Sequence, residues 1–105
     1  MTFNTPRYII FVVIKTIKDE ETRKVFQRQF SLKLPPSIQQ VSLRKLRMLN
    51  NAENLNDLRV PPGNHLEKLT GKRAGQYSIR INDTWRICFE WSDDNAYNVE
   101  IIDYH

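Results

Sequence analysis

The feature that most constrains the fold of this chain is a pair of alternating segments near the C-terminus, GQYSIRINDTWRICFEW, from Gly75 to Trp91. Apolar and polar residues alternate on both sides of Asn82-Asp83-Thr84, which is the pattern of a β-hairpin with one face on a core. For the two apolar sets to share that face, Ile81 must lie opposite Trp85, so the turn has three residues. A two-residue turn would bury an unpaired Arg86, at a cost of several kcal/mol.

The last strand of the chain, AYNVEIIDY, continues this sheet. Carrying the alternation through the next turn gives the expected partners Trp91–Tyr97, Phe89–Val99 and Arg86–Ile102. Arg80, Arg86 and Tyr104 then gather on the face away from the core, and His105 ends the chain beside them. Asp103 is expected to point partly toward the core side.

The first half of the chain predicts one strand and two helices. The β-branched segment Arg7–Lys18 predicts a strand, and its apolar run is too short to cross a bilayer. A helix is expected to follow, with Asp19 as N-cap and an apolar stripe of Val25, Phe26 and Phe30.

A second helix is expected from Pro36 to about Asn51, because the preceding proline pair ends the first one. Its core-facing residues should be Ile38, Val41, Leu46 and Leu49, and its mostly exposed ones Arg44, Lys45 and Arg47. A loop with one helical turn near Leu55 then leads to His65, after which the pattern is all strand, beginning with residues 65–69. The order of elements predicts one α+β domain over residues 1–105, with helices on one face of an antiparallel sheet.

Charge and cysteine content limit the classes of function. The net charge is +4, but residues 1–86 hold all 16 Lys and Arg with 7 acids, and residues 87–105 hold 5 acids and no Lys or Arg. A basic body suits a polyanion such as RNA, and the equally weighted alternative is a basic surface without a specific partner. A single cysteine, Cys88, excludes an internal disulfide and a cysteine-rich metal site, and it fits a reducing compartment.

The face that carries Arg80, Arg86 and Tyr104 has the chemistry for RNA. Arginine forms charge-assisted, bidentate bonds to phosphate, and an aromatic ring stacks on a base. Guanidinium does not release its proton, so Asp103, Tyr104 and His105 are the candidates for proton transfer. The alternative is structural: the arginines form a solvated sheet face, Tyr104 caps the core edge, and Cys88 is a packed small hydrophobe.

The segment Asp57–Trp91 together with VEIIDYH strongly resembles the HigB type of RelE-like toxins of bacterial toxin–antitoxin operons, sometimes labelled killer proteins of plasmid maintenance systems. A looser match begins at Ile14. The resemblance implies a RelE-like α+β fold with two N-terminal helices on one face of a curved, mainly antiparallel sheet. It also implies a cytoplasmic, metal-independent endoribonuclease, without cofactors, that cuts mRNA in the ribosomal A site by attack of the 2′-hydroxyl on the adjacent phosphate. The implied partners are the ribosome, mRNA and a helix-turn-helix antitoxin of the HigA type. Operator DNA is contacted only through that antitoxin, and no membrane is involved.

By position, the resemblance makes Arg86 the residue that contacts the scissile phosphate, and it draws acid–base and stacking groups from Asp103, Tyr104 and His105. The residues expected to hold RNA are His65, Lys68, Thr70, Lys72, Arg73, Gln76 and Arg80.

Two of these positions depart from the family pattern. Thr70 stands where many relatives have lysine, and His65 stands where close relatives often have arginine, so the positive surface is weaker. Residues 1–12 extend beyond the usual start of the family. The rival functions are a non-catalytic RNA- or antitoxin-binding member of the same family and a housekeeping RNA-processing factor.

Overall fold

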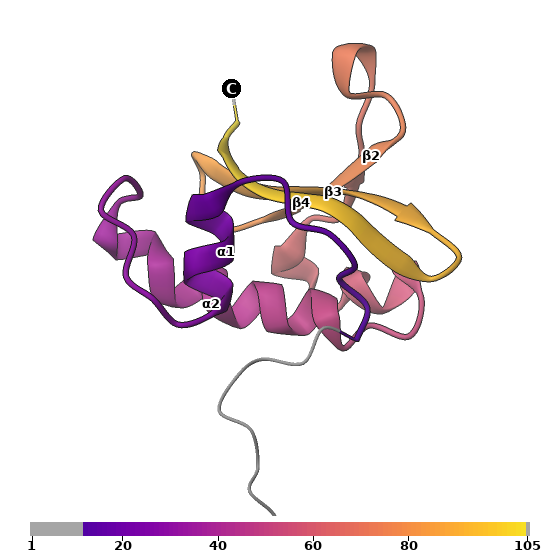
Figure 1. The fold of residues 1–105 in the computed structure, drawn as a ribbon. Helices are drawn as coiled ribbons and strands as arrows, with labels where there is room; N and C mark the ends of the chain where they lie inside the picture. The colour runs from indigo at the N-terminus through magenta and orange to yellow at the C-terminus, as the bar shows by residue number, and fades with distance from the viewer. Residues whose placement is uncertain (1–11, 105) are drawn as a thin grey trace, which may run out of the picture.

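The computed structural model describes residues 12–104, and its order of elements confirms the expected α+β class (Figure 1). Two α-helices lie on one side of a four-stranded antiparallel sheet of order β1-β2-β3-β4. The elements are α1 (Glu20–Phe26), α2 (Pro36–Asn50), η1 (Leu55–Arg59), η2 (Pro62–Asn64), β1 (Glu67–Lys68), η3 (Gly71–Arg73), β2 (Gln76–Arg80), β3 (Trp85–Ser92) and β4 (Asn95–Asp103). The main core lies between the helices and the sheet.

Helix α1 begins where the sequence indicates, because Asp19 Oδ2 accepts a hydrogen bond from Thr22 N at 3.1 Å. Val25 and Phe26 are buried, as expected. The helix ends at Phe26, and Arg28 takes a left-handed φ of 64° that turns the chain away. The expectation that Phe30 completes the apolar stripe is therefore wrong, and its side chain is 60% exposed.

Helix α2 matches the expected range within a residue and buries Ile38, Leu46 and Leu49. The expectation that Lys45 is exposed is wrong. Its Nζ donates to Asn64 Oδ1 inside the fold, and burial lowers the pKa of this ammonium, with help from the charges of Arg44 and Arg80. This hydrogen bond offsets part of the free-energy cost of burying the ammonium, and it links α2 to η2.

The hairpin register is confirmed. Tyr77 pairs with Phe89 and Arg80 with Arg86, and Ile81 N donates to Trp85 O at 2.9 Å, so the turn has three residues. Asn82 Oδ1 accepts hydrogen bonds from the backbone N–H groups of Thr84, the last residue of the turn, and Trp85, the first residue of β3. The turn is thus stabilised by its own side chain.

The pairing of β3 with β4 is only partly as expected. Arg86 lies opposite Ile102, as expected, but Trp91 pairs with Ala96 and not with Tyr97. The turn has two residues, Asp93 and Asp94, both with positive φ, which suits a two-residue hairpin. A bulge between Cys88 and Glu90 then restores the register, because Asn98, at φ 53°, adds a residue to β4.

Two expected strands are shorter than the sequence suggests. Of the segment Arg7–Lys18, residues 7–11 lie outside the described residues, and the rest forms only isolated parallel bridges, Ile14 with Ala96 and Ile17 with Val99. Asn50 Oδ1 accepts the three backbone N–H groups of residues 12–14, each at 3.0 Å, in place of a strand ladder. After His65 the chain is not all strand, because β1 has two residues and η3 follows it.

Candidate active site

Arg86 is the centre of the site and is more buried than expected, with only 11% of its side chain exposed. Its Nη1 donates to Ser78 Oγ at 2.7 Å and to the His65 backbone oxygen at 3.3 Å. Its Nη2 donates to Glu67 Oε1 at 2.7 Å. The structural alternative of a solvated sheet face is therefore wrong for this arginine, because β1, β2 and the η2–β1 connection hold it in a fixed position.

Tyr104 lies against Arg86, as the strand register predicts. The guanidinium carbon is 5.5 Å from the centre of the phenol ring, which is a cation–π distance. The backbone of Tyr104 is fixed by a hydrogen bond from its N–H to Thr84 O at 2.8 Å. The end of β4 is thus tied to the β2–β3 turn, and the ring is presented beside the buried cation.

A pocket of about 370 Å³ opens next to this pair. It is lined from one side by Thr70, Lys72 and Arg73, and from the other by Ile102, Asp103 and Tyr104. In Figure 1 the β1–β2 connection and the C-terminal end of the chain both rise on the side of the sheet opposite α2. Four of the expected site residues therefore meet in one pocket with Tyr104.

An ion-pair network holds the turn that carries Lys72 and Arg73. Arg73 Nη1 donates to Glu100 Oε2 at 3.2 Å and to Gln76 Oε1 at 3.0 Å, and Lys18 Nζ lies 3.3 Å from the same carboxylate oxygen. Gln76 belongs to β2 and Glu100 to β4, so the Arg73 side chain crosses over β3. The network thus fixes η3 above the sheet, near the pocket.

Cys88 lies under this network and is fully buried, as the packed-hydrophobe interpretation predicts. Burial raises the pKa of its thiol to about 11, and the charge of Glu100 acts in the same direction. A neutral, inaccessible thiol is a packing group and not a nucleophile.

The other expected residues take separate positions. Arg80 pairs with Arg86 across the strands, but its guanidinium is bound to Asp83. Lys68 lies opposite Tyr77 in the ladder, so strand alternation directs it to the other face of the sheet from Arg86. His65 contributes its backbone oxygen to Arg86 and has a left-handed φ of 45°. His105 lies outside the described residues.

Glu67 is the site residue that sequence reasoning missed. It is a carboxylate 2.7 Å from the guanidinium and 48% exposed, so it can reach both Arg86 and solvent. The sequence held one signal for it. Residues 67 and 69 share a face of the strand by alternation, and Leu69 is buried on the side away from the main core, so Glu67 lies on that side too. Assigning that face needs the register with β2, which depends on the shape of the β1–β2 connection.

The described part of the chain has neither a cluster of metal ligands nor a membrane-spanning helix. Within residues 12–104 no three side chains of His, Cys, Asp or Glu come together as a metal site. Among these residues no helix has both the length and the apolar character needed to span a bilayer.

The fold is also found in a solved structure of another protein. The structure resembles a chain of the YoeB–YefM complex from Staphylococcus aureus with a TM-score of 0.55, over 88% of this chain and 97% of the other. At 20% sequence identity, this likeness shows a shared fold.

The sequence gives the family. Residues 15–105 match the model of the RelE-like toxin of type II toxin–antitoxin system HigB, and the chain belongs to that family. It is 45% identical to "Toxin HigB-1" of Vibrio cholerae serotype O1 over 65 residues, which is 62% of this chain and 68% of the relative. It is 26% identical to "Endoribonuclease HigB" of Proteus vulgaris over 93 residues, 89% of this chain and all of the relative. The family membership, the fold class and the endoribonuclease activity named for one relative agree with the resemblance described above.

Proposed function

We propose that this protein is a ribosome-dependent endoribonuclease that cleaves mRNA in the ribosomal A site, as the toxin of a type II toxin–antitoxin module. The observation that carries the proposal is Arg86, held by three hydrogen-bond acceptors beside Tyr104 at the edge of a basic pocket. A relative named as an endoribonuclease supports the same reaction class.

The pocket supplies the positive charge for the reaction. Lys72 and Arg73 line it, and Arg86 lies beside it under Tyr104. A phosphate in the pocket is attracted by these cations, and Arg86 stabilises the negative charge that grows on the phosphate oxygens in the transition state. Tyr104 offers a ring on which a neighbouring base stacks.

The proton transfers need groups other than arginine. The 2′-hydroxyl oxygen bonds to phosphorus, the bond to the 5′-oxygen breaks, one proton leaves the 2′-hydroxyl and one is delivered to the 5′-oxygen. We assign the general base to Glu67, because a carboxylate can take a proton and this one lies 2.7 Å from Arg86 Nη2. Asp103 and His105 remain the candidates for the acid and its orientation. No metal ion is needed for this scheme, because the cations of the pocket take the electrophilic role.

The partners follow from the family. The toxin acts in the cytoplasm, where ribosomes and mRNA are found, and a helix-turn-helix antitoxin of the HigA type neutralises it. Operator DNA is contacted through that antitoxin.

The rival proposal is a family member that binds without cleaving. It is favoured by Thr70, which lines the pocket where many relatives have lysine. A cleaving enzyme loses cleavage on substitution of Arg86 while its ribosome affinity changes only a few-fold. A pure binder loses affinity similarly with Arg86→Ala and Lys72→Ala, and each lost contact lowers the slope of log affinity against log salt concentration by about one unit.

The test is induced expression of the wild type beside Arg86→Lys, with growth and mRNA 5′ ends recorded together and folding checked by circular dichroism. Lysine keeps the charge but not the forked geometry. Arrest with in-frame cuts that disappear in the folded variant supports the proposal. Absence of arrest and cuts with folded wild-type protein contradicts it.

A further inference from the structure

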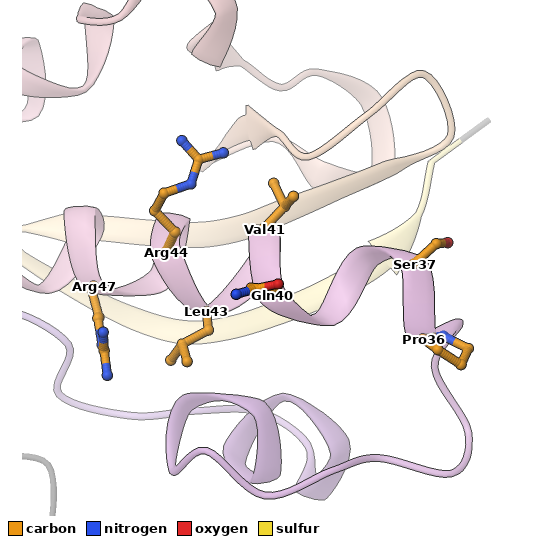
Figure 2. Close-up of a pocket in the computed structure, with 7 residues that line it drawn as sticks. All are labelled: Pro36, Ser37, Gln40, Val41, Leu43, Arg44 and Arg47. Carbon is orange, nitrogen blue, oxygen red and sulfur yellow. The ribbon is translucent and has the colours of Figure 1, made fainter.

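A second surface, on the opposite side of the molecule from the pocket, has no part in the proposed cleavage. Figure 2 shows it along the outer side of α2: Val41 and Arg44 extend to one side of the helix, and Leu43 and Arg47 to the other. A cavity of about 710 Å³ lies over these residues. The half-buried apolar side chains of Val41 and Leu43 thus lie next to the cations Arg44 and Arg47 on the outer side of α2.

A neighbouring cavity of about 290 Å³ extends this surface to the end of α1. It shares Gln40 and Leu43 with the first and adds Val25, Arg28 and Phe30. We call the two together the α2 groove. Phe30 is 60% exposed, and Leu32 in the same α1–α2 connection is 91% exposed. Exposed large apolar side chains beside a groove are typical of a protein-binding surface.

The charge of the α2 groove selects the kind of partner. Arg28, Arg44 and Arg47 line it, neither cavity is lined by an acidic residue, and no carboxylate in residues 12–104 pairs with these arginines. The complementary ligand is an acidic segment with an apolar side. Residues 1–11 of the chain itself contain one arginine and no acid, so they do not match.

We infer that the α2 groove binds an acidic, amphipathic helical segment of the antitoxin. The apolar side of such a helix lies between α2 and the end of α1, over Leu43 and Phe30, and its carboxylates meet Arg44 and Arg47 on α2. Phe30 offers RNA one ring, but the rest of the apolar lining, Val25, Val41 and Leu43, is aliphatic and gives a base nothing to stack on. The inference rests on the antitoxin partnership of the proposed function, and not on the cleavage chemistry.

The experiment measures binding of the purified cognate antitoxin by calorimetry at low and high salt. The variants are Arg44→Glu/Arg47→Glu and Phe30→Ser, and the matched control is Arg59→Glu, an exposed arginine of η1 outside the groove. We expect the double variant to bind at least about tenfold more weakly, with a smaller salt dependence, and the control to stay within about twofold. Thermal melts verify that each variant is folded.

Three outcomes are informative. Antitoxin affinity within about twofold of wild type for both groove variants overturns the inference. Weaker binding to isolated ribosomes with unchanged antitoxin binding also overturns it and makes the groove an RNA-docking surface. Cleavage of mRNA is assayed separately. Groove variants that still cut mRNA but escape the antitoxin support the inference. Loss of cutting in Arg86→Lys alone shows that antitoxin binding and cleavage can be lost independently.

Discussion

Replacing Glu67 by Gln separates the structural role of its carboxylate, as a partner of Arg86, from its proposed role as general base. Glu67 Oε1 accepts a hydrogen bond from Arg86 Nη2 at 2.7 Å. Glutamine keeps the length of the side chain and an acceptor oxygen, but it cannot take a proton at neutral pH. Glu67→Gln therefore preserves much of the support for Arg86 and removes the proposed base.

The expected effects on stability and on rate differ in size. The Glu67 side chain is 48% exposed, so loss of its charge should lower the free energy of unfolding by less than about 1 kcal/mol. Arg86 keeps its bonds to Ser78 and to the His65 backbone. Removing a general base typically slows a reaction by about 10²–10⁴-fold. The rate should therefore fall by orders of magnitude in a protein that remains folded.

The assay is single-turnover cleavage of mRNA on programmed ribosomes across a range of pH. Glu67→Gln should cleave about 10²–10⁴-fold more slowly than the wild type throughout this range. Glu90→Gln is the matched control, because Glu90 is an exposed acid of β3 outside the pocket. Cleavage by Glu67→Gln within a few-fold of wild type at every pH would refute the assignment of Glu67 as base.

Three further predictions concern the surroundings of the pocket. Arg86→Ala should lower the free energy of unfolding by about 2–4 kcal/mol in urea denaturation, because the buried Ser78 hydroxyl and the His65 carbonyl lose their donor; a loss under about 1 kcal/mol contradicts this. Burial raises the pKa of Cys88 from 9.0 to about 11, so between these pH values the folded protein binds more protons than the unfolded chain. The free energy of unfolding should therefore fall by about 2–3 kcal/mol as the pH rises through this range. Urea denaturation at several pH values measures this loss, and Cys88→Ala should abolish it. Glu100→Gln removes the ion pair that fixes Arg73, so amide exchange at Ala74 should accelerate, and unchanged exchange would show that η3 is held in another way.

The register of the sheet shows what alternation predicts and what it does not. The pairing of Arg86 with Ile102 was predictable because both strands keep strict alternation at that end. The other end was not, because a two-residue turn at Asp93 shifts the pairing by one and the extra residue at Asn98 shifts it back. The two deviations cancel at Arg86, so the site was placed correctly although Tyr97 was not.

Lys45 illustrates a conflict between spacing and residue type. It lies seven positions after Ile38 and four before Leu49, which places it in the middle of the buried face of α2. Its charge indicated exposure instead, because lysine is rarely buried without a partner. The partner, Asn64, lies 19 residues further on in a short 3-10 helix that no periodicity predicts.

Glu67 was missed for a related reason, and its position has a consequence for RNA binding. The β1–β2 connection contains a left-handed Gly71 and the short η3, and alternation does not determine how such a connection aligns β1 with β2. With that alignment known, Glu67 Oε1 accepts a hydrogen bond from Arg86 Nη2 at 2.7 Å. A phosphate must share or displace this carboxylate, which costs free energy at the moment of binding. Arg86 alone is thus a poor capture site for free RNA, and Lys72 and Arg73, or an already aligned substrate, must supply the affinity that brings the phosphate to it.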